Sequence, residues 1–123
     1  MLRSSPPQSD PCPIAPVMDV LFNKWTAQVL WALIHDGRLR FSDLHRRLPD
    51  VTAKVLSQRL RQLERDGLVT RTIYAEVPPR VEYEATDMAI TLSPVFTSLA
   101  EWSQEHTRAI QTARQAYTGK LVA

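Results

Sequence analysis

The chain has 123 residues, of which 44% are hydrophobic and 23% are charged, as in one soluble globular domain and unlike a disordered segment. No apolar run approaches the ~20 residues that cross a membrane, and residues 1–16 lack the apolar stretch of a secretory signal. We therefore expect a cytoplasmic protein without a membrane partner. Cys12 is the single cysteine, which excludes an internal disulfide.

The charge is unevenly distributed along the chain. The net charge is only +2, yet residues 38–65 hold eight Lys and Arg against three acidic residues, a local net charge of +5. A basic block in a nearly neutral chain is typical of a protein that meets a polyanion. The simpler interpretation is a solvated helix face, and charge alone does not separate the two.

The N-terminal part predicts an arm, two helices and a strand. Residues 1–13 hold four of the nine prolines and little to bury, which indicates a flexible arm. Apolar residues at helical spacing predict a helix over 14–22 and a second from Lys24 to His35, with Asn23 as its N-cap. Asp36 and Gly37 should end the second helix. A short strand is expected at 38–40.

The middle of the chain predicts a helix-turn-helix. A third helix is expected over 41–48, and Pro49 and Asp50 should break it. A fourth helix is expected over 52–66, because the hydroxyl of Thr52 can cap it and Gly67 occupies the position that favours glycine after a helix.

Two strands and a long helix complete the pattern. The strands are expected at 68–74 and 81–85, with two prolines in the tip between them. A helix is expected over about 87–117, and residues 119–123 form a tail. Pro94 either opens this helix, with Ser93 as its cap, or kinks it, and the sequence leaves both possibilities open. The element order predicts an α+β, mainly helical winged helix-turn-helix over 14–118, with the wing at about 68–85.

The helix expected at 52–66 has an apolar face of leucines and an opposite polar face. The polar face holds Lys54, Ser57, Gln58, Arg61 and Arg65. Arg and Lys can bond guanine, Gln can pair with adenine, and Ser can bond a base or a phosphate. In helix-turn-helix docking, the N-terminal part of the second helix meets the bases. An ordinary amphipathic helix shows the same faces, but the turn, the basic block and the hairpin together favour DNA binding.

The hairpin tip fits a DNA-contacting wing. Pro78 and Pro79 stiffen it, so less entropy is lost on docking, and Arg80 suits the negative potential of a narrow minor groove. A solvent-exposed turn residue is the alternative reading of Arg80. The predicted DNA-binding residues are Arg40, Ser42, Thr52, Lys54, Ser57, Gln58, Arg61 and Arg80.

Three stretches together resemble the HxlR-type winged-helix regulators, which are relatives of the MarR class. They are CPIAPVMDVLFNKW (12–25), RFSDLHRRLPDVTAKVLSQRLRQLERDGLVTRTIYAEVPPRVEY (40–83) and LSPVFTSLAEW (92–102). The chain departs from that family at residues 21–23, where small glycines are usual, and at 86–89, where Thr-Glu-Leu-Gly is frequent. Both departures fall outside the expected recognition helix, so they leave the fold in place and bear on the dimer contact or any pocket beside it.

The resemblance implies a homodimer that binds a palindromic operator, represses or activates transcription, and dimerises through its N- and C-terminal helices. The apolar surface of these helices exceeds what one small core needs, although the long helix could instead cover the core of a monomer. The predicted dimerisation residues are Val17, Val20, Leu21, Leu92, Val95, Phe96, Leu99 and Trp102.

Cys12 matches a cysteine that in some HxlR-type proteins senses oxidants, quinones or aldehydes. The start of a helix favours the thiolate form, which is the reactive one. The hypothesis is that modification of Cys12 changes DNA affinity, with an oxidant or small molecule as inducer. The simpler reading is a small residue without a sensing role.

Other function classes find little support in the sequence. His35, His45 and His106 lack neighbours at metal-ligand spacing, and the three glycines form no phosphate loop. We therefore expect no metal, no cofactor and no enzyme activity. The alternative function is a winged-helix protein-interaction module without sequence-specific DNA reading, which would have no need of the basic block.

Overall fold

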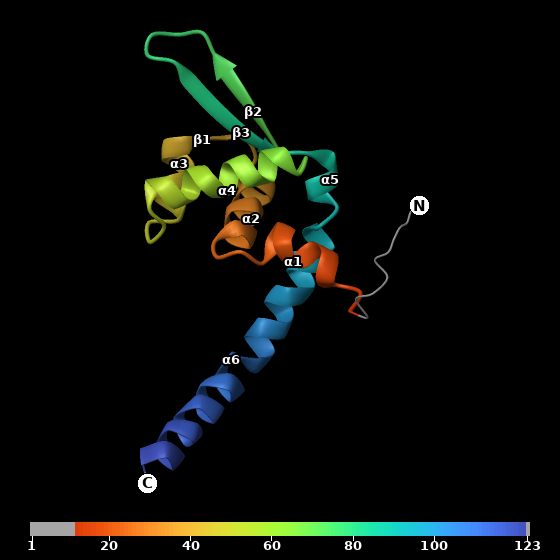
Figure 1. Cartoon of the computed structure of the whole chain (residues 1–123), viewed down its shortest axis with the longest axis vertical. Helices are drawn as coiled ribbons and strands as arrows, with labels where there is room; N and C mark the ends of the chain where they lie inside the picture. The colour runs from red at the N-terminus through yellow and green to blue at the C-terminus, as the bar shows by residue number, and fades with distance from the viewer. Residues whose placement is uncertain (1–11, 123) are drawn as a thin grey trace. The chain divides into compact units, whose positions relative to one another are not determined.

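The computed structural model describes residues 12–122, which divide into two compact units (Figure 1). The first unit ends at Thr91, and the second begins at Leu92. The first unit contains α1 (Ala15–Leu21), α2 (Thr26–Asp36), β1 (Leu39–Arg40), α3 (Phe41–Arg47), α4 (Ala53–Arg65), β2 (Val69–Tyr74), β3 (Arg80–Ala85) and α5 (Asp87–Ile90). The second is α6 (Ser93–Val122). This mainly helical arrangement with a small sheet confirms the predicted winged helix-turn-helix.

Aliphatic side chains form the core of the first unit. α4 supplies Leu56, Leu60 and Leu63, each at most 1% exposed, and packs against α2 and β2. Burying each such side chain contributes about 1.5–3 kcal/mol to folding. The remaining buried apolar residues are Leu21, Val29, Leu30, Ala32, Leu33, Leu39, Leu44, Val51, Leu68, Val69 and Ala89.

The ends of α4 are fixed as the sequence predicts. The amide of Val55 donates to the hydroxyl oxygen of Thr52 at 3.1 Å, which makes Thr52 the N-cap. At the other end Gly67 has a φ of +80°, and Leu68 donates to the carbonyl of Leu63 at 2.9 Å. This pattern is a Schellman motif, which satisfies the last carbonyls of the helix. Both ends therefore set the length and direction of α4.

The three strands form an antiparallel sheet in the order β1-β3-β2. β2 pairs with β3 from Val69 opposite Ala85 to Tyr74 opposite Arg80. The tip at residues 75–79 therefore takes no part in strand pairing, and its prolines remove no hydrogen bond from the sheet. Figure 1 shows the β2–β3 hairpin projecting away from the helices of the first unit, as a wing does.

The start of α2 differs from the sequence prediction. α2 begins at Thr26 rather than Lys24, because Trp25 adopts a left-handed conformation with a φ of 78°. The side chain of Asn23 does not cap α2 and instead donates to the carbonyl of Asp19 at 3.1 Å.

The expected helix over 87–117 is two helices. Thr86 caps α5, accepting a hydrogen bond from the amide of Ala89 at 3.3 Å. Pro94 lies in the first turn of α6, so it opens that helix rather than kinking it.

The second unit is a continuous helix of 30 residues that runs to Val122, past the end expected near residue 117. None of the helices within residues 12–122 combines the length and the apolar character that crossing a bilayer requires. Large apolar side chains of α6 are exposed in the single chain. They are Val95, Leu99, Trp102, Ile110, Tyr117 and Leu121.

Candidate nucleic-acid interface

The outer face of α4 is polar and open to solvent. Lys54 and Arg61 are exposed, and Ser57 and Gln58 are half-buried, on the side opposite the buried leucines. An open depression of about 480 Å³ is lined by Gln58, Arg61, Gln62 and Arg65. The fold thus brings together the side chains that the sequence assigned to base reading.

Most cations of the basic block have a partner inside the chain. The paired residues are Arg38, Arg46, Arg47, Arg59 and Arg65. Arg59 donates from Nε to the carbonyl of Lys24 at 2.7 Å, which ties α4 to the segment before α2. Arg65 lies 3.1 Å from a carboxylate oxygen of Asp66. These side chains neutralise charge or support the fold, so the local net charge overstates what a polyanion would meet.

Three cations of the block remain: Arg40, Lys54 and Arg61. All three are exposed, and none makes a hydrogen bond or ion pair with another residue in the described range 12–122. Arg40 immediately precedes α3, while Lys54 and Arg61 lie two turns apart on α4. A charged side chain without a counter-ion loses no intramolecular pair when it binds a phosphate or a base edge. Of the eight cations in the block, these three could therefore bind such a group at the lowest cost.

The two predicted hydroxyl contacts differ in their surroundings. Ser42 is exposed in the first turn of α3. Thr52 is exposed as well, but its oxygen accepts the capping bond from Val55. A hydroxyl that accepts can still donate its proton. Thr52 can therefore cap α4 and donate to a phosphate at the same time.

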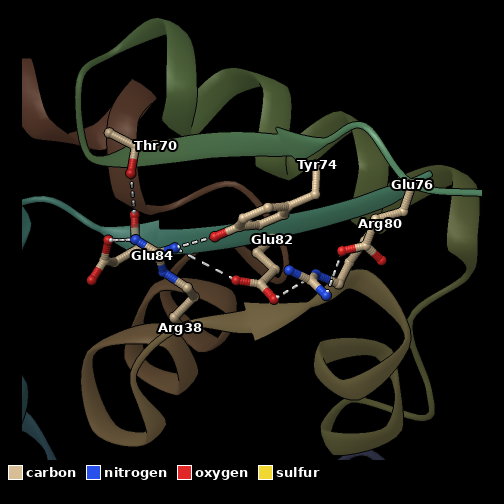
Figure 2. Close-up of polar contacts among 7 residues, drawn as sticks. All are labelled: Arg38, Thr70, Tyr74, Glu76, Arg80, Glu82 and Glu84. Atoms are coloured by element: carbon tan, nitrogen blue, oxygen red, sulfur yellow. Dashed lines mark hydrogen bonds and ion pairs between the residues drawn. The ribbon is translucent and has the colours of Figure 1, made fainter.

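Arg80 is held by an ion-pair network on one face of the wing (Figure 2). Its Nη1 lies 2.8 Å from Glu76, and its buried Nε lies 3.1 Å from Glu82, an ion pair without the alignment of a hydrogen bond. The guanidinium also stacks on the ring of Tyr74, with 4.0 Å to the centroid. The side chain is only 26% exposed. Arg80 is therefore paired and partly enclosed, unlike a solvent-exposed turn residue.

Arg38 completes the network from the segment before β1. It donates to the Tyr74 hydroxyl at 2.6 Å and to Glu84 at 2.9 Å, and it lies 3.6 Å from Glu82. The hydrogen bond with Glu84 raises the pKa of Arg38 further above its ordinary value. Sequence reasoning missed this network. The available signal was the spacing of Arg80, Glu82 and Glu84, which alternate onto one face of a strand.

A groove of about 460 Å³ separates the wing tip from the start of α3. Arg40, Phe41 and Ser42 line one wall, and residues 76–81 line the other. The groove brings together three of the predicted DNA contacts, since Arg80 belongs to the second wall. Its mixed lining of cations, a hydroxyl and apolar side chains is suited to a sugar–phosphate strand.

The predicted sensor and dimer residues are found in varied surroundings. Cys12 lies just before α1 and is exposed. Its carbonyl accepts a hydrogen bond from the amide of Ala15 at 3.1 Å. Leu21 is 5% exposed in the single chain. Among the other predicted dimer residues, Val17, Val20, Leu92 and Phe96 are half-buried, and Val95, Leu99 and Trp102 are exposed.

Sequence comparison finds relatives among transcriptional regulators. The chain is 37% identical over 108 residues to the uncharacterized HTH-type transcriptional regulator YdeP of Bacillus subtilis, covering 85% of this chain and 84% of that protein. The family model described as HxlR-like helix-turn-helix matches residues 20–111. The matched range includes both helices of the helix-turn-helix and the wing.

Solved structures show the same similarity in three dimensions. The redox regulator HypR in its reduced form has a TM-score of 0.76 and 35% identity, over 82% of this chain and 99% of HypR. The reduced form of the transcriptional regulator YodB from B. subtilis has a TM-score of 0.67 and 28% identity, over 76% of this chain and 92% of YodB.

Proposed function

The chain belongs to the HxlR-like helix-turn-helix family of transcriptional regulators, and from this premise we propose that it is a homodimer that binds a palindromic DNA operator sequence-specifically. The recognition helix, residues 52–66, enters the major groove. The wing tip, residues 75–80, contacts the minor groove or the phosphate backbone. The proteins to which the chain is related are regulators and not enzymes.

One observation carries this proposal: the outer face of α4 presents Lys54, Ser57, Gln58 and Arg61 opposite its buried leucines. Lys54 and Arg61 can donate hydrogen bonds to guanine, and the amide of Gln58 can pair with adenine. Lys54 and Arg61 make no ion pair with any other residue in the part of the chain that the structure describes. Both cations can therefore bind a base edge or a phosphate without giving up an intramolecular ion pair.

The homodimer is supported by the apolar side chains of α6. At about 100° per residue, the six exposed ones fall within an arc of roughly 100°, which forms one continuous stripe along the helix. A stripe of this kind is unfavourable in water and is suited to the same stripe of a second copy. Two-fold symmetry would place two recognition helices about one DNA turn apart, which matches a palindromic operator.

A binding selection tests the proposal. We would select duplexes from a random-sequence pool with the full chain, and then measure their affinity by fluorescence anisotropy. We expect enrichment of a palindrome. Replacing Gln58 or Arg61 by Ala should relax the preference at single base positions by about 1–3 kcal/mol.

The matched control is Arg108→Ala, which removes an exposed cation from α6 away from its apolar stripe and should leave the preference unchanged. Recovery of no common sequence would favour the alternative of a protein-interaction module. Unchanged base preference in both α4 variants would refute the docking of α4 in the major groove.

A second proposed property is a response to oxidants through Cys12. The exposed thiol just before α1 and the resemblance to the redox regulator HypR support it. Treating the full chain with diamide should change its affinity for the selected duplex, and Cys12→Ser should abolish the change. An equal response in the serine variant would contradict the proposal.

A further inference from the structure

The carboxylate of Glu76 forms an ion pair with Arg80, the wing arginine that is proposed to contact DNA. We propose that Glu76 is an affinity-determining residue, because its carboxylate competes with a DNA phosphate for Nη1 of Arg80. The inference rests on the proposed DNA binding and adds a residue that opposes it. The affinity of the wing for DNA then depends on both Arg80 and Glu76.

The contacts of Arg80 differ in how easily they can be replaced. Glu82 is only 18% exposed and is shared with Arg38, so its place beside Nε of Arg80 is enclosed. Glu76 is 48% exposed and lies at the edge of the wing tip, 2.8 Å from Nη1. Figure 2 shows Arg80 between these two carboxylates. The contact with Glu76 is therefore the one that a ligand from solvent can displace.

The remaining contacts hold Arg80 in place during such an exchange. The guanidinium stacks on the Tyr74 ring, and the Tyr74 hydroxyl accepts a hydrogen bond from Arg38 at 2.6 Å. Arg38 is in turn paired with Glu84 at 2.9 Å. A phosphate oxygen forms the same kind of charge-assisted hydrogen bond as a carboxylate oxygen. The exchange thus replaces one acceptor by another without rebuilding the wing.

The groove beside the wing gives the phosphate a place to bind. Glu76 and Arg80 lie on one wall, and Arg40 and Ser42 lie on the other. A phosphate between the walls is attracted by two guanidinium groups and repelled by the Glu76 carboxylate. Glu76 consequently opposes binding twice, once by holding Arg80 and once by its own charge.

The experiment uses Glu76→Gln, which keeps the size of the side chain and removes its charge. The probe is a mixed-sequence duplex of about 30 base pairs, long enough for two half-sites, titrated by fluorescence anisotropy over a series of salt concentrations. We expect roughly two- to fivefold tighter binding at low salt, the range that release of an exposed ion pair allows. The slope of log K against log salt should steepen by ~1.8, because one phosphate contact is added in each of the two wings of the dimer.

Two further variants decide whether the effect acts through Arg80. Glu84→Gln removes an equally exposed carboxylate from the same face of the wing, where its partner is Arg38, and it should change affinity much less. In an Arg80→Gln background, Glu76→Gln should lose most of its effect. Circular dichroism and urea midpoints would verify that every variant is folded.

The possible outcomes separate this inference from the proposed function. An equal gain in Glu84→Gln, or a gain that persists without Arg80, would overturn the role of Glu76 and indicate a general charge effect. Unchanged affinity in Glu76→Gln, with normal binding by the wild-type chain, would also overturn it but leave the proposed function standing. Failure of the wild-type chain to bind any duplex would remove both.

Discussion

Individual side chains of the same type have different roles in this molecule. Arg59 donates to a backbone carbonyl and Arg80 is enclosed by carboxylates and a ring, whereas Arg61 makes no ion pair with the residues described at 12–122. Substitutions of these three arginines should therefore report on different properties. Loss of Arg59 should reduce stability, loss of Arg61 should reduce base preference, and loss of Arg80 should affect the wing.

Tyr83 gives the stability of the protein a dependence on pH. Burial raises the pKa of its phenol above the ordinary value. A raised folded-state pKa stabilises the fold below the unfolded-state pKa of about 10, and this contribution is lost as the pH rises through the folded-state pKa. The free energy of unfolding should thus fall above about pH 10.

Urea unfolding of wild type and Tyr83→Phe measures this effect, because all other groups titrate alike in both proteins. The difference between their unfolding free energies should be constant from about pH 7 to 9 and should change in favour of the phenylalanine variant above about pH 10. A difference that stays constant up to about pH 11 would show that burial does not protect this phenol.

The sequence could predict which residues lie on the polar face of α4, because helical spacing alone places Lys54 and Arg61 opposite the leucines. It could not predict that Arg80 is paired with Glu76 and stacked on Tyr74. The partners Glu76 and Tyr74 come together only when β2 and β3 pair in one register, and Arg38 reaches them from a separate segment. Pairing across strands depends on the folded sheet, which local sequence patterns do not specify.

Helices in this chain begin and end mainly where short-range chemistry dictates. Thr52 and Gly67 delimit α4, and both could be read from the sequence because a cap depends on neighbours within a few residues. The start of α2 could not, since the left-handed conformation of Trp25 opposes the preference of a bulky residue. Thr86, the cap at the start of α5, could also be predicted from the sequence. The break between α5 and α6 could not, because the apolar pattern continues from one helix into the next.

Removal of the cap of α4 should reduce stability at the scale of one helix. Thr52→Ala loses the acceptor for the amide of Val55 and should lower the free energy of unfolding by about 1 kcal/mol, within a range of about 0.5–2 kcal/mol. Urea unfolding measures the loss. Thr112→Ala, in the interior of α6, is the control and should be neutral or slightly stabilising because alanine favours helices. Equal effects of the two changes would argue against a specific capping role.

At the scale of the whole molecule, the exposed stripe on α6 should decide the oligomeric state. Trp102, which is 55% exposed in the single chain, lies within this stripe. A charge at this position would be buried without a partner in a dimer, so Trp102→Glu should weaken association by at least ~30-fold, as loss of an aromatic hot spot does.

Light scattering should then report the 14.0 kDa monomer in place of a species of twice that mass. Gln104→Glu introduces the same charge about 200° around the helix and should leave the larger species intact. A Trp102 variant that keeps the larger mass would place the dimer contact elsewhere.

The strand order β1-β3-β2 leaves β2 as an open edge of the sheet. An edge of six residues, with Ile73 60% exposed, is long enough to recruit a strand from another molecule. Arg71, which pairs with Glu64, places charge on this edge, and the prolines of the tip offer no amide that would extend it. The same hairpin that reaches outward thus carries features that oppose edge-to-edge strand pairing, and exchange of Arg71 for an aliphatic residue should make such pairing easier.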